Sequence, residues 1–209
     1  MNKIVYSNEN HIKKFHDTIP AEYIPNYVTP TLQNDIYSLL SSLQFAKVTY
    51  NKFGKLRSTP RSSWCYGQID DTATYKELTF KTEPIPGWLF HIKSPIEQYL
   101  GIDFNAVIIN KYENGDDYIS WHQDDEKFLD HHVVASISIG MERAFQMRSD
   151  EKGIIHEIQL KSGSLLIFND VRHSLPKRKN VSGVRFNITF RKVKDNTGIG
   201  NYYYYNRGK

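Results

Sequence analysis

The feature that most constrains the fold is a strictly alternating segment near the end of the chain, residues 185–191, with the sequence RFNITFR. Side chains of a β-strand point alternately to opposite faces of its sheet. Phe186, Ile188 and Phe190 therefore share an apolar face, which predicts burial in a core. The opposite face carries Arg185, Asn187, Thr189 and Arg191.

This polar face has two interpretations. It is either the solvated face of an ordinary strand or the wall of a ligand site. Two arginines that flank an asparagine and a threonine favour a dicarboxylate ligand. The reason is that guanidinium groups bind carboxylates through paired hydrogen bonds and stay charged when desolvated.

A histidine and a carboxylate two residues apart, His122 and Asp124, form a candidate metal site. On an extended backbone they project from the same face, so that one imidazole and one carboxylate can hold a single ion. The tripeptide is common by chance, and two surface residues near a turn are the alternative. A second histidine would complete a 2-His-1-carboxylate triad, which suits Fe(II) enzymes that activate oxygen.

His173 supplies the second histidine, after an apolar run at residues 164–168 that is typical of a buried strand. Iron ligands followed by a carboxylate-binding strand indicate 2-oxoglutarate as co-substrate. We therefore predict an Fe(II) site that uses 2-oxoglutarate and O2. Its metal-binding and catalytic residues are His122, Asp124 and His173.

Motifs that occur in a fixed order resemble those of the AlkB family of Fe(II)/2-oxoglutarate-dependent nucleic-acid dealkylases. They are FNAVIINKY, HQDDE, HSLPKRK and RFNITFR. The resemblance runs from about residue 53 to about residue 192 and is closest to the branch that repairs alkylated bases in duplex DNA. It implies oxidative demethylation of 1-methyladenine and 3-methylcytosine in DNA. 2-Oxoglutarate decarboxylation would drive hydroxylation of the alkyl group, with release of formaldehyde.

The resemblance also implies a role for each residue of the co-substrate site. Arg185 matches the residue on the distal carboxylate of 2-oxoglutarate, and Tyr112 and Thr189 accompany it. The residues expected at the carboxylate next to the metal are Arg191, Asn110 and Asn187.

Base recognition is expected near the same centre. Tyr75 matches an aromatic residue that stacks on the flipped base, although a half-buried strand tyrosine is the alternative. Glu126, next to Asp125, matches an acidic residue that meets the exocyclic amino group, and a solvated loop carboxylate is its alternative. Arg61 belongs to the segment that covers the nucleotide in the related enzymes.

Two further segments resemble contacts to duplex DNA. Phe53, between two lysines and beside Gly54, resembles an apolar finger that fills the gap left by a flipped base. Packing of this ring within the lid is the alternative. Lys177, Arg178 and Lys179, here called the basic loop, resemble a phosphate-binding loop. The match is incomplete because Asn180 stands where a further basic residue is usual.

Composition agrees with a folded nucleic-acid-binding protein. The 209 residues are 39% hydrophobic and 13% aromatic, with a net charge of +4, which permits a polyanionic partner. Cys65 is the single cysteine, which excludes an internal disulfide framework. With no membrane span or signal peptide in the pattern, we expect an intracellular monomer, nuclear if the source is eukaryotic and otherwise cytoplasmic.

The expected fold is mainly β with flanking helices, in which a double-stranded β-helix, or jelly roll, forms the core. Strands are expected at residues 103–112, 133–139, 144–147, 154–160, 164–168 and 185–191, with a hairpin at 48–57. Helices are expected at residues 32–43, capped by Thr31, and at 88–100, interrupted or restarted at Pro95. The single domain comprises an N-terminal extension (1–30), a nucleotide-recognition lid (48–85), a catalytic core (103–192) and a tail (195–209).

Three other functions remain open at this point. The same chemistry could act on RNA or single-stranded DNA. A jelly-roll oxygenase could hydroxylate a protein side chain, which Tyr75, Glu126 and the basic loop disfavour. A non-catalytic nucleic-acid-binding module is disfavoured because every iron ligand and both arginines are present.

Overall fold

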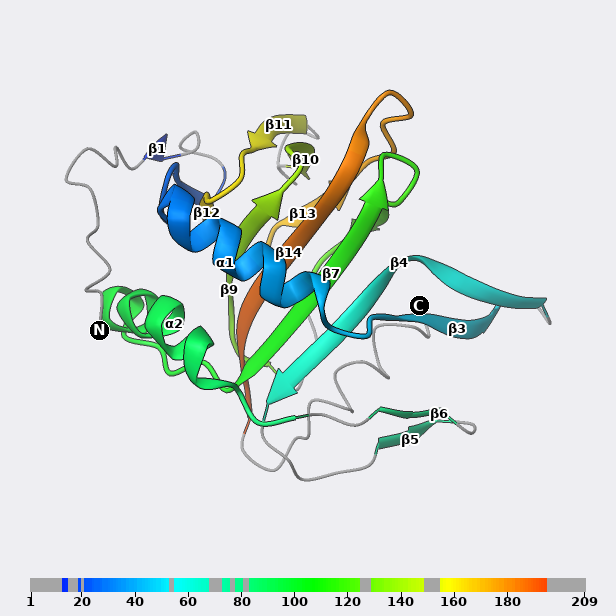
Figure 1. Ribbon diagram of the computed structural model, residues 1–209, viewed down its shortest axis with the longest axis horizontal. Helices are drawn as coiled ribbons and strands as arrows, with labels where there is room; N and C mark the ends of the chain where they lie inside the picture. The colour runs from blue at the N-terminus through cyan, green and yellow to red at the C-terminus, as the bar shows by residue number, and fades with distance from the viewer. Residues whose placement is uncertain are drawn as a thin grey trace.

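Two antiparallel sheets form the body of the molecule in a computed structural model (Figure 1). The structure describes residues 13–14, 19, 21–52, 55–67, 73–75, 78–80, 83–124, 129–148 and 155–194. The larger sheet has the order β1 (Lys13–Lys14), β2 (Ala21–Ile24), β12 (Leu165–Asn169), β9 (Leu129–Gly140), β14 (Ser182–Val193), β7 (Ala106–Asn114), β4 (Lys55–Gly67) and β3 (Ala46–Lys52). The smaller sheet has the order β11 (Ile155–Leu160), β10 (Arg143–Arg148), β13 (Arg172–Leu175) and β8 (Ile119–His122). A separate hairpin joins β5 (Ala73–Tyr75) to β6 (Leu78–Phe80).

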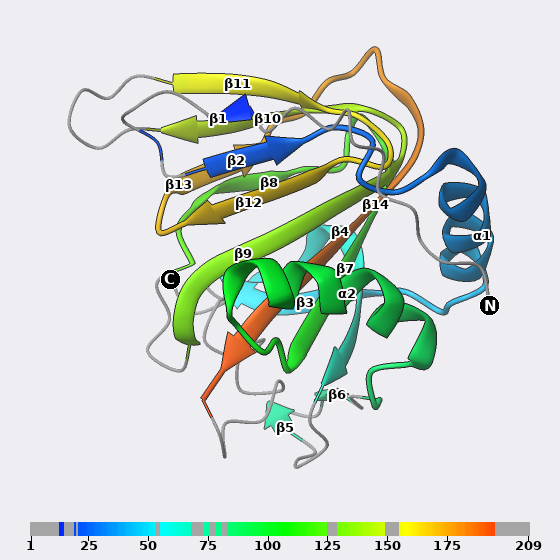
Figure 2. The same cartoon turned by 90° about the vertical axis from the view of Figure 1, so that its left-hand side faces the viewer.

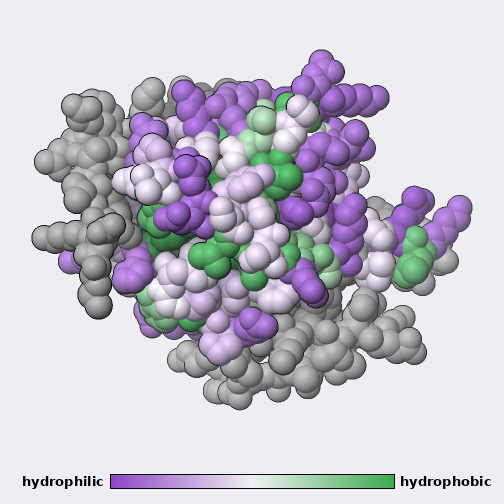
Figure 3. Space-filling model, in the orientation of Figure 1, coloured by the Kyte–Doolittle hydropathy of each residue, from purple (hydrophilic) through white to green (hydrophobic). Residues whose placement is uncertain are grey.

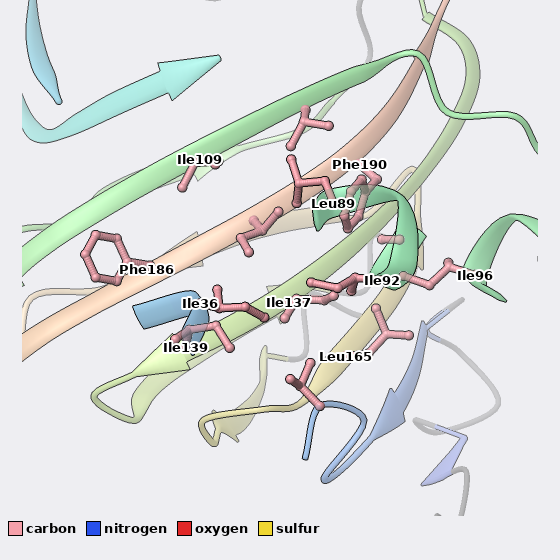
Figure 4. Packing of buried hydrophobic residues seen from close by; sticks show 14 of the residues in the cluster. Ile36, Leu89, Ile92, Ile96, Ile109, Ile137, Ile139, Leu165, Phe186 and Phe190 are labelled. Carbon is pink, nitrogen blue, oxygen red and sulfur yellow. The ribbon is translucent and has the colours of Figure 1, made fainter. Parts of the chain in front are cut away.

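Two helices cover one face of the larger sheet, namely α1 (Pro30–Ser41) and α2 (Gly87–Leu100) (Figures 1 and 2). Phe186 and Phe190 of β14 point into the core beneath them, together with Ile36 of α1 and Leu89 of α2 (Figure 4). Each fully buried side chain of this size contributes about 1.5–3 kcal/mol. The apolar face of the alternating segment is therefore the helix-covered face, as the sequence predicts.

A second core lies between the two sheets. Phe145 and Met147 of the smaller sheet pack there with Val134, Leu166 and Phe168 of the larger sheet. The two facing sheets, with helices outside, form the predicted jelly roll. The polar face of β14 is turned away from the helices because its apolar face is turned toward them.

Both helices differ in detail from the sequence prediction. Helix α1 begins at Pro30 with Thr29 as N-cap, not with Thr31, and Thr29 makes no side-chain capping bond. Proline suits the first helical position because its fixed φ is helical and its missing N–H is not needed there. Helix α2 is not interrupted at Pro95 and ends at Leu100, where Gly101, with a φ of 67°, forms a left-handed cap.

Part of the expected N-terminal extension belongs to the larger sheet. Ala21–Ile24 form β2, which pairs with β12, and Tyr23 lies in the core between the sheets. No strand was predicted from the sequence in this segment. The alternation covers only four residues beside prolines, so its strand pattern is too short to recognise. Strands β8 and β13, which carry the candidate histidines, were not predicted either.

The region predicted as a lid contains two hairpins. Strands β3 and β4 pair from Ala46–Ser63 to Lys52–Lys55, which matches the expected hairpin, and β4 continues into the larger sheet by pairing with β7. The function of residues 48–85 as a lid stays a prediction. In the part of the chain described, neither helix has the length and hydropathy needed to cross a lipid bilayer.

Candidate metal and co-substrate site

The pairing of β8 with β13 brings the three predicted metal ligands together. His122 lies opposite His173 in the register, and Asp124 follows His122 by two residues. One possible ligand atom from each residue lies within 4.8 Å of the other two. The Nε2 atoms of His122 and His173 are 3.9 Å and 3.7 Å from the carboxylate oxygens of Asp124. This geometry can hold one ion and leave further coordination positions open.

Backbone carbonyls orient both imidazoles. Nδ1 of His122 donates to the carbonyl oxygen of Ser120 at 2.9 Å, and Nδ1 of His173 donates to that of Val171 at 2.9 Å. Each Nε2 is thereby left without its proton and faces Asp124 as a ligand atom. The Phe145 ring stacks on His173 with centroids 5.3 Å apart, which fixes the plane of that imidazole.

The protonation states also suit a divalent cation. Burial and the adjacent His173 lower the pKa of His122 to about 4, and burial lowers the pKa of His173. Burial favours a raised pKa for Asp124, but Arg191 and the two histidines outweigh it and hold that pKa below its usual range. Near neutral pH the site therefore holds two neutral imidazoles and a carboxylate, the forms that bind metal.

The polar face of β14 forms the wall beside this cluster. All four of its predicted residues are buried, and in the register Arg185 lies opposite Tyr112 while Asn187 lies opposite Asn110. Arg191 approaches the metal cluster, since its Nη1 lies 3.0 Å from Oδ2 of Asp124. The predicted co-substrate residues thus come from two neighbouring strands of one sheet.

Arg185 is the best test of whether the wall fits a carboxylate ligand. Its side chain is 1% exposed, and Nη2 donates to Oγ of Ser138 at 2.9 Å. Among the described residues, Nε and Nη1 find no hydrogen-bond acceptor, and no carboxylate lies within 4.0 Å. Burial lowers the pKa of Arg185 to about 10, so it remains charged near neutral pH. A buried cation with unfilled donors is costly, so the wall fits an anion such as the distal carboxylate of 2-oxoglutarate.

Other predicted co-substrate residues are held by hydrogen bonds. Nδ2 of Asn187 donates to Oγ of Ser136 at 2.7 Å, and Oγ1 of Thr189 donates to the carbonyl of Ile108 at 2.9 Å. Oδ1 of Asn110 accepts from Nε of Arg61 at 3.0 Å. Arg61, predicted as a nucleotide contact, is therefore tied to the co-substrate wall.

The predicted nucleic-acid contacts are only partly described. Lys177 places its ammonium 5.2 Å from the centre of the Tyr118 ring, and Arg178 forms a 2.7 Å ion pair with Glu157. Lys179 is exposed. Tyr75 belongs to β5, but its side chain is not described. Phe53, Asp125 and Glu126 lie outside the described residues.

Two surface arginines were missed by the sequence reasoning. Arg148 and Arg172 are directly opposite each other in the β10–β13 pairing, and both are exposed. Like charges in opposing positions destabilise a sheet unless an anion neutralises them. The pairing of two strands that are far apart in sequence creates this feature, so neither segment carries a signal of it alone.

Residues 20–191 match the 2OG-Fe(II) oxygenase superfamily. The chain belongs to this superfamily. Membership confirms the predicted use of Fe(II), 2-oxoglutarate and O2, for which the residues described above provide suitable ligands.

Curated relatives in the superfamily include AlkB homologues, which agrees with the resemblance seen in the motifs. The chain is 37% identical to DNA oxidative demethylase ALKBH2 of Homo sapiens over 155 residues, covering 68% of this chain and 59% of that protein. It is 36% identical to alpha-ketoglutarate-dependent dioxygenase alkB homolog 3 of Homo sapiens over 152 residues, covering 64% and 52%. The chain therefore spans little more than half the length of these relatives.

Two solved structures share the fold of this chain. The structure of OsALKBH1 matches with a TM-score of 0.66 at 18% identity, covering 85% of this chain and 100% of that chain. A 2OG-Fe(II) oxygenase family oxidoreductase from Burkholderia pseudomallei matches with a TM-score of 0.58 at 13% identity, covering 82% and 84%.

Proposed function

We propose that this protein is a 2-oxoglutarate-dependent dioxygenase that demethylates N-alkylated bases in DNA, with duplex DNA as the preferred form. The observation that carries the proposal is the His122–Asp124–His173 cluster beside the buried guanidinium of Arg185. The relatives named DNA oxidative demethylase support the choice of substrate.

The residues of the site divide into two groups in this proposal. His122, Asp124 and His173 would hold Fe(II). Arg185 would bind the distal carboxylate of 2-oxoglutarate, and Arg191 would lie at the end next to the metal. When bound, the metal and co-substrate supply the oxidation of a carbon–hydrogen bond by O2, with loss of CO2 from 2-oxoglutarate.

The protein itself contributes charge balance and exclusion of water. Arg191 keeps Asp124 ionised and oriented through the 3.0 Å ion pair. Phe145 and Phe168 pack on His173, so that side of the cluster is closed to solvent. An N-methyl group that is hydroxylated at its carbon leaves as formaldehyde when the carbon–nitrogen bond breaks. The electron pair of that bond stays on the nitrogen, which restores the unmodified base.

Exposed positive charge supports a nucleic-acid substrate. Arg148 and Arg172 lie opposite each other on the smaller sheet. Arg178 of the basic loop lies beside the same sheet, because it forms an ion pair with Glu157 of β11. Hydrophilic residues cover the loop between β13 and β14 and much of the face around it (Figure 3). Phosphate groups would neutralise this surface, and their binding would weaken as salt increases. A DNA substrate also supports an intracellular location, in the nucleus if the source is eukaryotic.

The β3–β4 hairpin supports the preference for duplex DNA. It projects from the body of the molecule (Figure 1), and Leu56 on β4 is 76% exposed between the exposed Lys55 and Arg57. An apolar group among cations suits entry into a base stack whose phosphates lie close by. Phe53, which follows Lys52 in the sequence, would fill the gap left by the flipped base. Tyr75 and Glu126 would then contact that base within the site.

A panel of methylated oligonucleotides tests the proposal. Purified protein with Fe(II), 2-oxoglutarate and O2 would be incubated with 1-methyladenine and 3-methylcytosine in duplex DNA, single-stranded DNA and RNA. We expect mass spectrometry to show base restoration, fastest in duplex DNA, and none with the His173→Ala variant. If bases are restored only in RNA, the substrate is RNA and not DNA. If bases are restored in no oligonucleotide, the proposal is refuted.

A further inference from the structure

A second buried arginine, Arg143, takes no part in the metal or co-substrate groups described above. Its side chain is 2% exposed, and among the described residues no carboxylate lies within 4.0 Å. Backbone carbonyls instead accept the hydrogen bonds of its two Nη atoms, while Nε finds no acceptor among the described residues. Nη1 donates to the carbonyl of Asn114, and Nη2 donates to those of Asp117 and Pro176, each at 2.9 Å.

These three carbonyls belong to two segments with different proposed functions. Asn114 is the last residue of β7, and Asp117 lies in the connection from β7 to β8, which leads toward His122. Pro176 directly precedes the basic loop. Figure 1 shows the β7–β8 and β13–β14 connections side by side at one end of the larger sheet.

The two connections are also clamped directly together. The amide of Arg178 donates to the carbonyl of Gly115 at 2.8 Å, and the amide of Gly115 donates to that of Val181 at 2.8 Å. A Cβ atom at position 115 would collide with the carbonyl oxygen of Arg178. Glycine is therefore required for this approach, and the main chain of the basic loop has little freedom to shift.

Arg143 also reaches the co-substrate wall. Its guanidinium carbon lies 5.9 Å from the centre of the Tyr112 ring, and that of Arg185 lies 5.3 Å from the same ring. Two buried cations against one ring repel each other. Burial is the main cause of the lowered pKa of Arg185, and the charge of Arg143 lowers it further. A carboxylate bound to Arg185 would relieve this repulsion.

We propose that Arg143 is a positioning residue that joins the basic loop to the co-substrate wall, so that 2-oxoglutarate and nucleic acid strengthen each other's binding. This inference rests on the proposed function, because it requires a nucleic-acid substrate at the basic loop. The effect must be reciprocal. If 2-oxoglutarate raises the affinity for nucleic acid by a certain factor, nucleic acid must raise the affinity for 2-oxoglutarate by the same factor.

Binding measurements without turnover test the inference. The probe is a labelled duplex oligonucleotide with one 1-methyladenine, titrated by fluorescence anisotropy into Mn(II)-loaded protein with and without 2-oxoglutarate. For the wild type we expect 2-oxoglutarate to tighten binding by about fivefold or more, the lower end of typical coupling between sites. Arg143→Lys keeps the charge but not the planar fork, so the ratio should fall close to one while each ligand still binds.

Two further variants separate positioning from loss of stability. Gln33→Ala removes a comparable link far from the site, where Gln33 donates to Val28 and accepts from Ser162, and should keep the wild-type ratio. Gly115→Ala disturbs the contact between Gly115 and Arg178 without changing Arg143. The ratio of oligonucleotide affinities with and without 2-oxoglutarate should fall close to one in this variant, even if Arg143→Lys fails to fold. A wild-type ratio in either clamp variant would overturn the inference.

Binding by the wild-type protein separates failure of the coupling from failure of the proposed function. If it binds the oligonucleotide equally with and without 2-oxoglutarate, the coupling is refuted while the proposed function stands. If it does not bind any methylated oligonucleotide, the proposed function fails and the inference fails with it.

Discussion

Replacing Arg185 by methionine should have opposite effects on co-substrate binding and on the stability of the free protein. Two buried donors of Arg185, Nε and Nη1, find no acceptor among the described residues. Hydrogen bonds to a charged group contribute about 1.5–3 kcal/mol each. Two such bonds together amount to roughly 3–6 kcal/mol, or about 10²- to 10⁴-fold in affinity. We expect Arg185→Met to weaken 2-oxoglutarate binding at least about a hundredfold.

The free protein should tolerate the same change. Replacing a buried charge by an apolar side chain of similar size is often neutral or stabilising, by about 1–4 kcal/mol. The loss of the bond to Ser138, which has a charged donor, costs about 1.5–3 kcal/mol and offsets much of that gain. We therefore expect the melting temperature without 2-oxoglutarate to stay the same or rise.

Calorimetric titration of Mn(II)-loaded protein measures the affinity, and differential scanning fluorimetry measures the melting temperature. The matched control is Ser138→Ala, which removes the 2.9 Å hydrogen bond from Nη2 of Arg185 to Ser138. It should weaken 2-oxoglutarate binding far less than Arg185→Met does, because the charge of Arg185 and its two donors without a described acceptor remain. An unchanged affinity in Arg185→Met would remove Arg185 from the co-substrate site. A strongly lowered melting temperature would show that its charge is satisfied within the protein.

Three other changes have defined outcomes. Replacing any metal ligand by alanine should abolish formaldehyde release, and activity close to wild type in a folded variant would show that the ligand assignment is wrong. Arg191→Ala should weaken Mn(II) binding as well as 2-oxoglutarate binding, because Asp124 loses its partner at 3.0 Å; calorimetry with the metal alone checks this. Phe53→Ala should lose most activity on methylated duplex DNA but keep activity on the single strand, where no base stack needs filling. Equal losses on both forms would make Phe53 a structural residue of the hairpin.

The sequence predicted those parts of the site that depend on local periodicity. The alternation of residues 185–191 placed both arginines on one face, and the i, i+2 spacing placed His122 and Asp124 together. Buried strands such as residues 164–168 were predicted from a second local pattern, a continuous apolar run bounded by polar or glycine-containing turns.

Features that depend on pairing between distant segments were not predictable. The position of His173 opposite His122 follows from the pairing of two four-residue strands, which are too short to show a pattern. Arg143 stands between polar and small residues, so nothing in its neighbourhood indicates a buried side chain. Its burial comes from three backbone carbonyls that only the tertiary fold brings together.

The stoichiometry of turnover tests the central claim most directly. A duplex oligonucleotide with one 1-methyladenine would be incubated with the Fe(II)-loaded protein, 2-oxoglutarate and O2, and succinate, formaldehyde and restored adenine would be quantified together. If the site couples 2-oxoglutarate decarboxylation to demethylation, the three products should form in equal amounts and only with the wild-type ligands. Succinate that forms at the same rate without methylated DNA, or without restored adenine, would contradict the account.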